Sequence, residues 1–419
     1  MTVVFINSVI VRFMWNESVI HVLFLLKFTS FNYNSRWHFR QVPFHLSIRY
    51  SILMQIALVH DFLVRMGGAE RVLFEFTKMF PKAPIFTLLY DEKLAGEKFP
   101  KEKVITSGLQ KLPGFLRKRH KYLFPIMPAQ IEQFDLSGYD MVISSSNAYA
   151  HGVVTNLRTK HICYCHSPMR YAWDWTHKYL GEQNLSGATK MFAMKRLERV
   201  RMWDMAAADR VDKYIANSNT VAGRIRKYYR QEADVIYPPV DVRRFSPKKT
   251  NENYFLIVST LTPYKRIDLA ISIFNRLGRR LVIIGDGGAR KYLENMAGPT
   301  IDFLGFKSDA VIKDYMENCR AVLFPGEDDF GIVPVEAMAC GKPVLAYGHG
   351  GATETVIPGV TGEFFYEPTL ESIEDGLARM LLNEPNYQYM KIRKHALEFD
   401  KEVFVEKFGR EVKKLTANR

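Results

Sequence analysis

Residues 321–344 read AVLFPGEDDFGIVPVEAMACGKPV, and this stretch holds the order of strand, loop and helix that decides the fold. Its four apolar residues at 321–324 predict a buried strand, residues 325–329 a loop, and residues 332–340 a helix closed by Gly341. Two carboxylates, Asp328 and Glu336, stand eight residues apart around the start of that helix. Because the N-terminus of a helix beyond a strand carries partial positive charge, this turn is a candidate phosphate site.

The same alternation of short apolar runs and helical patterns occurs throughout the chain from Met54 onward. It is typical of parallel sheets wrapped by helices. Pro238 and Pro239 interrupt regular structure and divide the alternation into two halves, each able to bury its own sheet. We expect strands at 55–59, 85–89, 141–144, 161–165 and 213–216 in the first half, and at 254–258, 280–284, 301–304, 321–324 and 343–346 in the second. The sequence therefore predicts an α/β protein of two similar, doubly wound domains that bind ligands beyond the carboxyl ends of their strands.

The charge of the chain limits its partners. Its 419 residues include 58 Lys and Arg against 44 Asp and Glu, which gives a formal net charge of +14. This excess suits nucleic acid, acidic lipid head groups or diphosphates, and it is equally compatible with a basic solvated surface. Because no recognition helix, zinc finger or aromatic ribonucleoprotein motif is present in the sequence, we expect no nucleic-acid partner.

The cysteines indicate the compartment and bear on metal binding. The chain has four, most of them inside apolar patterns, which is typical of a reduced, cytoplasmic setting. Cys163, Cys165 and His166 are close in sequence, but they lie in an expected strand and no second pair of ligands follows at short spacing. We therefore expect no metal site.

Residues 1–53 differ from the rest of the chain. Their apolar clusters are interrupted by charged residues, so no run approaches the roughly 20 residues that a membrane-spanning helix needs. They also lack the basic start and the cleavage site of a signal peptide. Met54 begins what resembles a first strand, so we expect that translation starts there. The alternative is that residues 1–53 form an unstructured or membrane-associating amphipathic leader.

Glycines and cations mark two further candidate anion sites. Gly67 and Gly68 follow the first expected strand and precede a helical pattern, where backbone amides can approach an anion closely, or where they form a simple turn. Lys265 and Arg266 follow the first strand of the second half. They are either positioned to neutralise a diphosphate or are solvated helix-surface charges.

From Met54 onward the chain resembles the family-4 retaining glycosyltransferases of the GT-B fold, and more narrowly the bacterial mannosyltransferases of O-antigen, lipopolysaccharide and exopolysaccharide assembly. The resemblance rests on the segments 54–62 (MQIALVHDF), 66–73 (MGGAERVL), 162–174 (ICYCHSPMRYAWD), 263–266 (PYKR) and 330–344 (FGIVPVEAMACGKPV). It implies two Rossmann-like domains facing each other across a cleft. The acceptor-binding domain is expected at 54–237, the nucleotide-sugar-binding domain at 238–398, and a C-terminal helix at 399–419 packing back on the first domain.

The resemblance also implies residue roles. Glu336 matches the second glutamate of the family's Glu-x7-Glu motif, which binds the donor ribose, and Asp328 stands at the first, which contacts the transferred sugar. The expected catalytic residues are Asp328, Glu336, His166 and Asn147. The expected donor contacts are Gly67, Gly68, Lys265, Arg266, Phe330, Gly331, Ile332, Val333 and Glu336, and the expected acceptor-side residues are His151 and Arg170. As the family performs this chemistry, no metal or other cofactor is required.

Three positions depart from the family's pattern. Asp328 is one methylene shorter than the usual glutamate, which changes its reach toward a sugar hydroxyl. Thr260 replaces a common arginine five residues before Lys265, and Asn147 replaces a cleft histidine. Asparagine cannot take a proton, although His151 or His166 can substitute, and in the family the leaving phosphate is usually described as accepting the proton itself.

The function implied is transfer of a hexose, first of all mannose from GDP-mannose, to a lipid-linked or polysaccharide acceptor on the cytoplasmic side of the membrane. Residues 111–124 and 190–203 mix cations with apolar residues and predict a patch that binds anionic membranes, unless the apolar residues are ordinary core. One alternative is a nucleotide-sugar 2-epimerase of the same fold. Another is a catalytically degenerate scaffold protein of polysaccharide assembly, which the three departures favour.

Overall fold

The computed structural model describes residues 8–15, 18–25, 54–182, 187–249 and 252–417. The chain divides into two units, Met1–Ser47 and Ile48–Arg419. In the first unit, β1 (Ser8–Trp15) and β2 (Ser18–Leu25) pair as an antiparallel hairpin, with Ser8 opposite Leu25. The hairpin differs from the unstructured leader that was one of the expectations for residues 1–53, because two runs rich in β-branched residues pair with each other. The expected translation start at Met54 stays a prediction.

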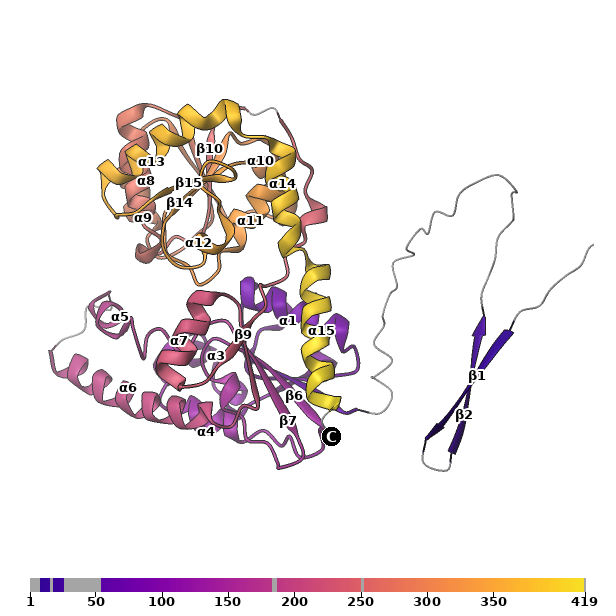
Figure 1. Ribbon diagram of the computed structural model, residues 1–419. Helices are drawn as coiled ribbons and strands as arrows, with labels where there is room; N and C mark the ends of the chain where they lie inside the picture. The colour runs from indigo at the N-terminus through magenta and orange to yellow at the C-terminus, as the bar shows by residue number, and fades with distance from the viewer. Residues whose placement is uncertain (1–7, 16–17, 26–53, 183–186, 250–251, 418–419) are drawn as a thin grey trace, which may run out of the picture. The chain divides into compact units, whose positions relative to one another are not determined.

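The second unit contains two lobes, each built on a parallel sheet (Figure 1). The sheet of the N-terminal lobe has the order β5-β4-β3-β6-β7-β8-β9. Its strands are β3 (Ile56–Leu63), β4 (Ile85–Tyr90), β5 (Val104–Thr106), β6 (Met141–Ser146), β7 (Lys160–Cys165), β8 (Lys213–Ala216) and β9 (Ala233–Val235). Its helices are α1 (Gly68–Met79), α2 (Glu92–Ala95), α3 (Gly114–Lys118), α4 (Met127–Glu132), α5 (Thr176–Glu182), α6 (Gly187–Ala208) and α7 (Asn219–Tyr229).

The C-terminal lobe has a six-stranded sheet in the order β12-β11-β10-β13-β14-β15. Its strands are β10 (Phe255–Val258), β11 (Leu281–Ile284), β12 (Ile301–Gly305), β13 (Ala321–Phe324), β14 (Val344–Tyr347) and β15 (Gly362–Phe365). Its helices are α8 (Ile267–Leu277), α9 (Arg290–Met296), α10 (Asp309–Asn318), α11 (Ile332–Ala339), α12 (Ala352–Thr355), α13 (Leu370–Asn383) and α14 (Tyr389–Ala396), and α15 (Lys401–Ala417) follows them. The predicted α/β fold of two doubly wound, Rossmann-like domains is confirmed.

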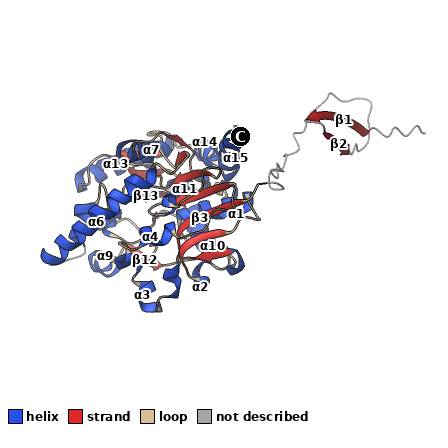
Figure 2. Ribbon diagram, turned by 90° about the horizontal axis from the view of Figure 1, so that it is seen from below, coloured by secondary structure: helices blue, strands red, loops and turns tan. Residues whose placement is uncertain are grey.

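Both faces of each sheet are buried by helices, as Figure 2 shows around the red strands. In β3, Leu58 packs into a core on one face, whereas Ala57 and Val59 pack into a second core on the other. Successive side chains of a strand point to opposite faces, so a continuous apolar run is what a strand covered on both sides requires. No helix among the residues described is long and apolar enough to cross a lipid bilayer.

The chain passes between the lobes twice, at neighbouring places. After β9 it crosses through Pro238 and Pro239, and it returns before α15. There the backbone N–H of Lys401 donates to the carbonyl of Val240 at 3.0 Å, and the N–H of Val240 donates to the carbonyl of Phe399 at 3.1 Å. Helix α15 then packs on the N-terminal lobe, with the rings of Phe404 and Phe408 against Phe76. The two crossings bring the carboxyl ends of both sheets to face one another.

Candidate active site

A cavity of about 540 Å³ lies between the two lobes, at the carboxyl ends of their central strands. It is bordered by the residues that follow β3, β6, β10 and β13 and by the first turns of α1 and α11. Open α/β sheets bind ligands at this edge. Its lining contains most of the predicted site residues, namely Gly67, Gly68, Asn147, His166, Lys265, Asp328, Phe330, Gly331, Ile332, Val333 and Glu336.

Two helices aim their N-termini into this cavity. Helix α1 begins after Gly67, and helix α11 begins after Gly331, whose φ of +83° is a conformation that favours glycine. The lobes touch here, since a Cβ on Gly68 would stand 3.2 Å from Cδ1 of Ile332. A Cβ on Gly331 would stand 3.0 Å from the ring of Phe324. The cavity thus combines two partial positive charges, an arrangement that favours a phosphate-bearing ligand.

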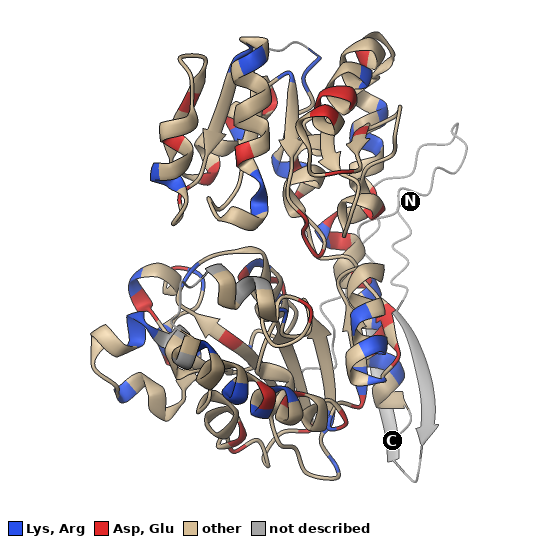
Figure 3. Cartoon of the chain, turned by 90° about the vertical axis from the view of Figure 1, so that its left-hand side faces the viewer, with Lys and Arg blue, Asp and Glu red and all other residues tan. Residues whose placement is uncertain are grey.

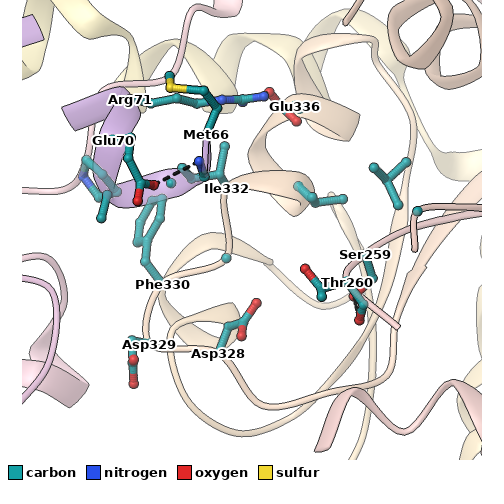
Figure 4. Close-up of a pocket in the computed structure, with 18 of the residues that line it drawn as sticks. Met66, Glu70, Arg71, Ser259, Thr260, Asp328, Asp329, Phe330, Ile332 and Glu336 are labelled. Atoms are coloured by element: carbon teal, nitrogen blue, oxygen red, sulfur yellow. Dashed lines mark hydrogen bonds and ion pairs between the residues drawn. The ribbon is translucent and has the colours of Figure 1, made fainter. Parts of the chain in front are cut away.

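Glu336 is buried on α11, and only one of its two carboxylate oxygens accepts hydrogen bonds from described residues. Its Oε1 accepts hydrogen bonds from Nη1 of Arg71 at 2.8 Å and from Nη2 of Arg244 at 2.6 Å. No hydrogen bond from a described residue reaches Oε2. The carboxylate of Asp309 lies 3.6 Å from Nη2 of Arg71 and 3.0 Å from Nη1 of Arg244. Asp309 and Glu336 therefore pair with the same two guanidinium groups. Figure 4 shows Arg71 of the N-terminal lobe extending across to Glu336 of the C-terminal lobe.

Lys265 and Asp328 form an ion pair at the opposite side of the cavity, with the Lys265 ammonium held by both carboxylate oxygens. Lys265 ends a short 3-10 turn, Pro263–Lys265, that follows β10. The loop after β13 packs directly on this turn, because a Cβ on Gly326 would stand 2.7 Å from the Cα of Lys265. The predicted phosphate lysine and the predicted sugar carboxylate therefore contact each other in this structure.

Asp61, to which sequence reasoning gave no role, fixes the loop that carries Asn147. Its carboxylate accepts four backbone N–H groups, those of residues 147, 148, 149 and 150, at 2.6 to 3.1 Å. Four hydrogen bonds from consecutive backbone amides to one carboxylate fix the conformation of this loop. The arrangement places Asn147 at the edge of the cavity.

His166 belongs to a buried polar network beneath Asn147. Its Nε2 lies 2.8 Å from Oγ of Ser145, and that serine contacts Nδ1 of His60 at 3.1 Å. Burial, together with the charge of His60, lowers the pKa of His166 to about 3. The imidazole is therefore neutral near pH 7 and is a weak proton acceptor there.

Basic and acidic residues lie on both lobes where the lobes face each other (Figure 3). Among the ion pairs is a second group that joins the lobes next to the cavity. Arg170 and Arg224 of the N-terminal lobe meet Glu327 and Asp329 of the loop after β13. Arg170 lies 3.4 Å from Asp329, and its guanidinium stacks on the ring of Trp175 at 3.3 Å. Arg170, predicted on the acceptor side, thus bridges the lobes and does not line the cavity.

Two other predicted residues lie outside the cavity. Arg266, whose backbone is left-handed (φ +50°), pairs with Asp268, 3.2 Å away, at the start of α8. His151 is only 2% exposed and contacts Asp204 at 3.2 Å. Burial alone lowers the pKa of His151, but the Asp204 carboxylate outweighs it, so the pKa lies above its usual value. The structure does not bring His151 to an acceptor position, because it is enclosed behind α6.

The thiols of Cys163 and Cys165 are buried within β7. Among the residues that the structure describes, no three His, Cys, Asp or Glu side chains gather in a way that would hold a metal ion.

Comparison with known proteins places the chain in a family. The model described as Glycosyltransferase Family 4 matches residues 66–244, and the model described as Glycosyl transferases group 1 matches residues 241–396. The chain is a GT-B glycosyltransferase of the family-4 type. The resemblance to the family-4 glycosyltransferases of the GT-B fold, inferred from the motifs, is thereby confirmed.

Individual relatives and a solved structure are also similar to this glycosyltransferase. An uncharacterized glycosyltransferase of Methanocaldococcus jannaschii is 30% identical over 178 residues, covering 41% of this chain and 50% of that protein. The chain therefore spans about half the length of this curated relative. Human alpha-1,3/1,6-mannosyltransferase ALG2 is 25% identical over 328 residues, covering 68% of this chain and 74% of that protein. The crystal structure of Anabaena HepE in complex with UDP has a TM-score of 0.63 at 18% identity, covering 86% of this chain and 100% of that one.

Proposed function

We propose that the protein transfers a hexose from a nucleotide sugar to an acceptor hydroxyl, with retention of the anomeric configuration. In this proposal the C-terminal lobe holds the donor and the N-terminal lobe the acceptor. The observation that carries it is the cavity between the lobes, where two helix N-termini, Lys265 and Glu336 line one space of about 540 Å³. A ligand with a ribose next to a diphosphate matches this set of groups.

The donor is oriented by groups at opposite sides of the cavity. Oε2 of Glu336 accepts hydrogen bonds from the ribose hydroxyls, while Arg71 and Arg244 hold Oε1. The N-terminus of α11 and Lys265 receive the diphosphate. Because an ammonium group has three donors, Lys265 can contact a phosphate oxygen and still hold Asp328, whose other lone pairs then accept from a sugar hydroxyl.

The chemistry requires stabilisation of the departing diphosphate more than a strong base. Lys265 and the N-terminus of α11 supply fixed positive charge where negative charge develops. His166 lines the cavity, but with a pKa of about 3 its imidazole does not hold a second proton near neutral pH. This supports a step in which the leaving phosphate takes the proton of the acceptor hydroxyl, while Asn147 and His166 orient the hydroxyl. We propose no metal for this reaction.

We propose GDP-mannose as the donor, as the motifs imply, with UDP-glucose as its competitor. The name of the human relative, a mannosyltransferase, supports the sugar. UDP-glucose is the competing donor because a structural neighbour, Anabaena HepE, was crystallised in complex with it.

The proposed acceptor is a lipid-linked or polysaccharide chain of cell-surface polysaccharide assembly, such as O-antigen, reached at the cytoplasmic face of the membrane. Exposed apolar side chains on α3 and α6, including Phe115, Met191 and Phe192, lie among cations and support contact with anionic lipid. Flotation with vesicles tests this contact. Binding that requires phosphatidylglycerol and weakens with salt supports it, whereas equal recovery with neutral vesicles contradicts it.

Incubation of the purified protein with each donor and a membrane extract tests the proposed reaction. We expect hexose to appear on an extractable acceptor, with the donor's anomeric configuration in the product by NMR. Formation of an epimer from the donor alone would indicate the 2-epimerase. Absence of binding to GDP- and UDP-sugars in a thermal-shift assay would indicate the scaffold protein, because a bound ligand stabilises the folded state.

A further inference from the structure

A second cavity, of about 690 Å³, lies in the N-terminal lobe beside the donor cavity. We call it the apolar cavity. Its walls come from the end of β3, from the segment 122–127, from the loop after β6 and from the first half of α6. Phe62, Phe124, Met127, Tyr149 and Phe192 are among its lining residues. Its volume is within the range of roughly 300 to 1,000 Å³ found for small-molecule sites.

The hydroxyl groups of Tyr149 and Tyr171 in this wall are satisfied within the protein. The hydroxyl of Tyr171 donates to the hydroxyl of Tyr149 at 2.7 Å, and Tyr149 donates to the carbonyl of Phe124 at 3.4 Å. The carboxylate of Asp61, which also borders the cavity, is held by four backbone amides. The groups presented to a ligand are therefore mainly hydrocarbon and ring faces, which favour an apolar occupant.

The two cavities meet at three residues. Arg65, Glu70 and Asn147 border both the apolar cavity and the donor cavity. A molecule whose apolar part fills the first can thus present a hydroxyl to the second at Asn147. This continuity distinguishes the apolar cavity from an isolated packing defect.

Two guanidinium groups, Arg65 and Arg196, stand at the rim of the apolar cavity, and Nε of Arg65 lies 4.0 Å from Oε1 of Glu70. Arg65 has a side chain that is 73% exposed, and Arg196 stacks on the ring of Phe192 at 4.8 Å. Glu70 is turned inward, where its Oε2 accepts from the backbone N–H of Gly67 at 2.8 Å. An anionic head group beside the apolar cavity would find two guanidinium groups.

Large apolar side chains continue outward from the apolar cavity to the surface. Tyr122 is 70% exposed and Phe192 is 60% exposed, and both border the cavity. Met191 and Met194, on the same half of α6, are also exposed, whereas Leu197 and Val200 further along the helix are buried. The stripe predicted at 190–203 is thus mixed: its exposed members Met191 and Met194 lie on the half of α6 that borders the apolar cavity, Val200 is core, and Met202 in the second half is exposed again.

We propose that the apolar cavity binds the hydrocarbon chain of an anionic lipid acceptor, with the phosphate of the lipid at Arg65 and Arg196 and the acceptor hydroxyl at Asn147. The inference rests on the proposed transferase function, because it assigns the acceptor of that reaction. It specifies the chemical class of the acceptor, an amphiphile, and the place where the acceptor binds. The hydrocarbon chain of this amphiphile is enclosed by the N-terminal lobe.

Calorimetric titration with three probes below their micelle concentrations tests this proposal on the full chain. Dodecyl phosphate carries both chain and head group, ethyl phosphate the head group alone, and dodecyl maltoside the chain with a neutral head. Each buried methylene strengthens binding about fourfold, so about two buried methylenes suffice for a tenfold preference for dodecyl over ethyl phosphate. We expect at least that preference. We also expect Arg196→Gln to weaken dodecyl phosphate binding severalfold and to leave dodecyl maltoside unchanged.

Variants locate the binding within the apolar cavity. Ala193→Phe fills the cavity, and Phe192→Asn, at an exposed position, removes part of its wall without a demand on folding. The matched control is Leu157→Asn, because Leu157 is 99% exposed and borders neither cavity. We expect the dissociation constant of dodecyl phosphate to rise at least tenfold in Ala193→Phe and severalfold in Phe192→Asn, with no change in the control.

Donor binding is measured separately by thermal shift with GDP-mannose and UDP-glucose. This measurement distinguishes failure of the lipid site from failure of the proposed transferase function. Donor binding without a chain-length preference, or equal effects of Ala193→Phe and Leu157→Asn, would overturn the lipid site alone. Binding of dodecyl phosphate without any donor binding would overturn the transferase function and, with it, the acceptor role of the cavity.

Discussion

Replacing Glu336 by alanine removes the carboxylate that we assign to the donor ribose. Helix α11 should persist, because alanine has the highest helix propensity. Arg71 and Arg244 keep Asp309 as a partner, so the substitution leaves neither guanidinium without a carboxylate. The expected result is a folded protein with weakened donor binding.

The size of the effect follows from the burial of Glu336, whose side chain is only 5% exposed. A hydrogen bond to a charged group contributes about 1.5 to 3 kcal/mol. Since 1.4 kcal/mol corresponds to a tenfold change, loss of one such bond raises the dissociation constant of the nucleotide about 10- to 150-fold. Loss of the interlobe pair with Arg71, itself 39% exposed, adds less, because exposed pairs contribute about 0 to 1 kcal/mol.

Calorimetric titration with GDP and UDP, and with their 2′-deoxy analogues, measures this loss and locates it. In the wild type the 2′-deoxy nucleotide should bind more weakly than its parent. In Glu336→Ala the two should bind alike, because their common partner is gone. Asp309→Ala is the matched control, since it removes the other carboxylate shared by the same arginines and should change affinity less than about fivefold. An equal 2′-deoxy penalty in wild type and variant would refute the ribose assignment.

Three further predictions concern the same cavity and its supports. Lys265→Met should raise the dissociation constant of a nucleoside diphosphate at least about tenfold in calorimetry and leave that of the parent nucleoside unchanged; equal losses for both would contradict a diphosphate role. Gly331→Ala should lower the free energy of unfolding in urea by about 1 to 2 kcal/mol, because φ there is +83°; an unchanged midpoint would show that the turn adapts. His161 and His166 have folded pKa values of about 3, below the usual 6.5, so the unfolded chain binds protons first. The free energy of unfolding should therefore fall between pH 6.5 and 3, by up to about 1.4 kcal/mol per pH unit for each. The pKa of His151 is raised in the folded state, so this histidine makes the opposite contribution and increases the free energy of unfolding as the pH falls. A stability profile that rises toward pH 5 would contradict the neutral burial of the first two.

The central strands of both sheets could be predicted because their residues are apolar on both faces. The strand expected at 321–324 coincides with β13, and that at 213–216 with β8. The strands that were not predicted, β5, β9 and β15, have three or four residues each. All three lie at sheet edges, where pairing with a neighbour, and not a local apolar run, defines the strand.

The candidate site was predicted where its residues are close in sequence and missed where they are distant. Glu336, Asp328 and the glycines belong to short motifs with a local signature. Arg71 and Arg244 pair with Glu336 across 265 and 92 residues, and no local pattern indicates such a pairing. The four amides held by Asp61 are equally remote, 86 to 89 residues away.

Two histidines show the limit of sequence reasoning about catalysis. A histidine near a strand end is compatible with an active-site role or a buried one. Burial decides between them: His166 borders the donor cavity, and His151 is enclosed with Asp204. Only the packing of α6 and α7 over the sheet supplies that information.

The crystal structure of the protein with a bound nucleoside diphosphate tests the central claim most directly. Our account predicts the diphosphate between Lys265 and the N-terminus of α11, with the ribose hydroxyls at hydrogen-bond distance, about 2.5 to 3.0 Å, from Oε2 of Glu336. A diphosphate bound elsewhere, or a ribose turned away from Glu336, would contradict it.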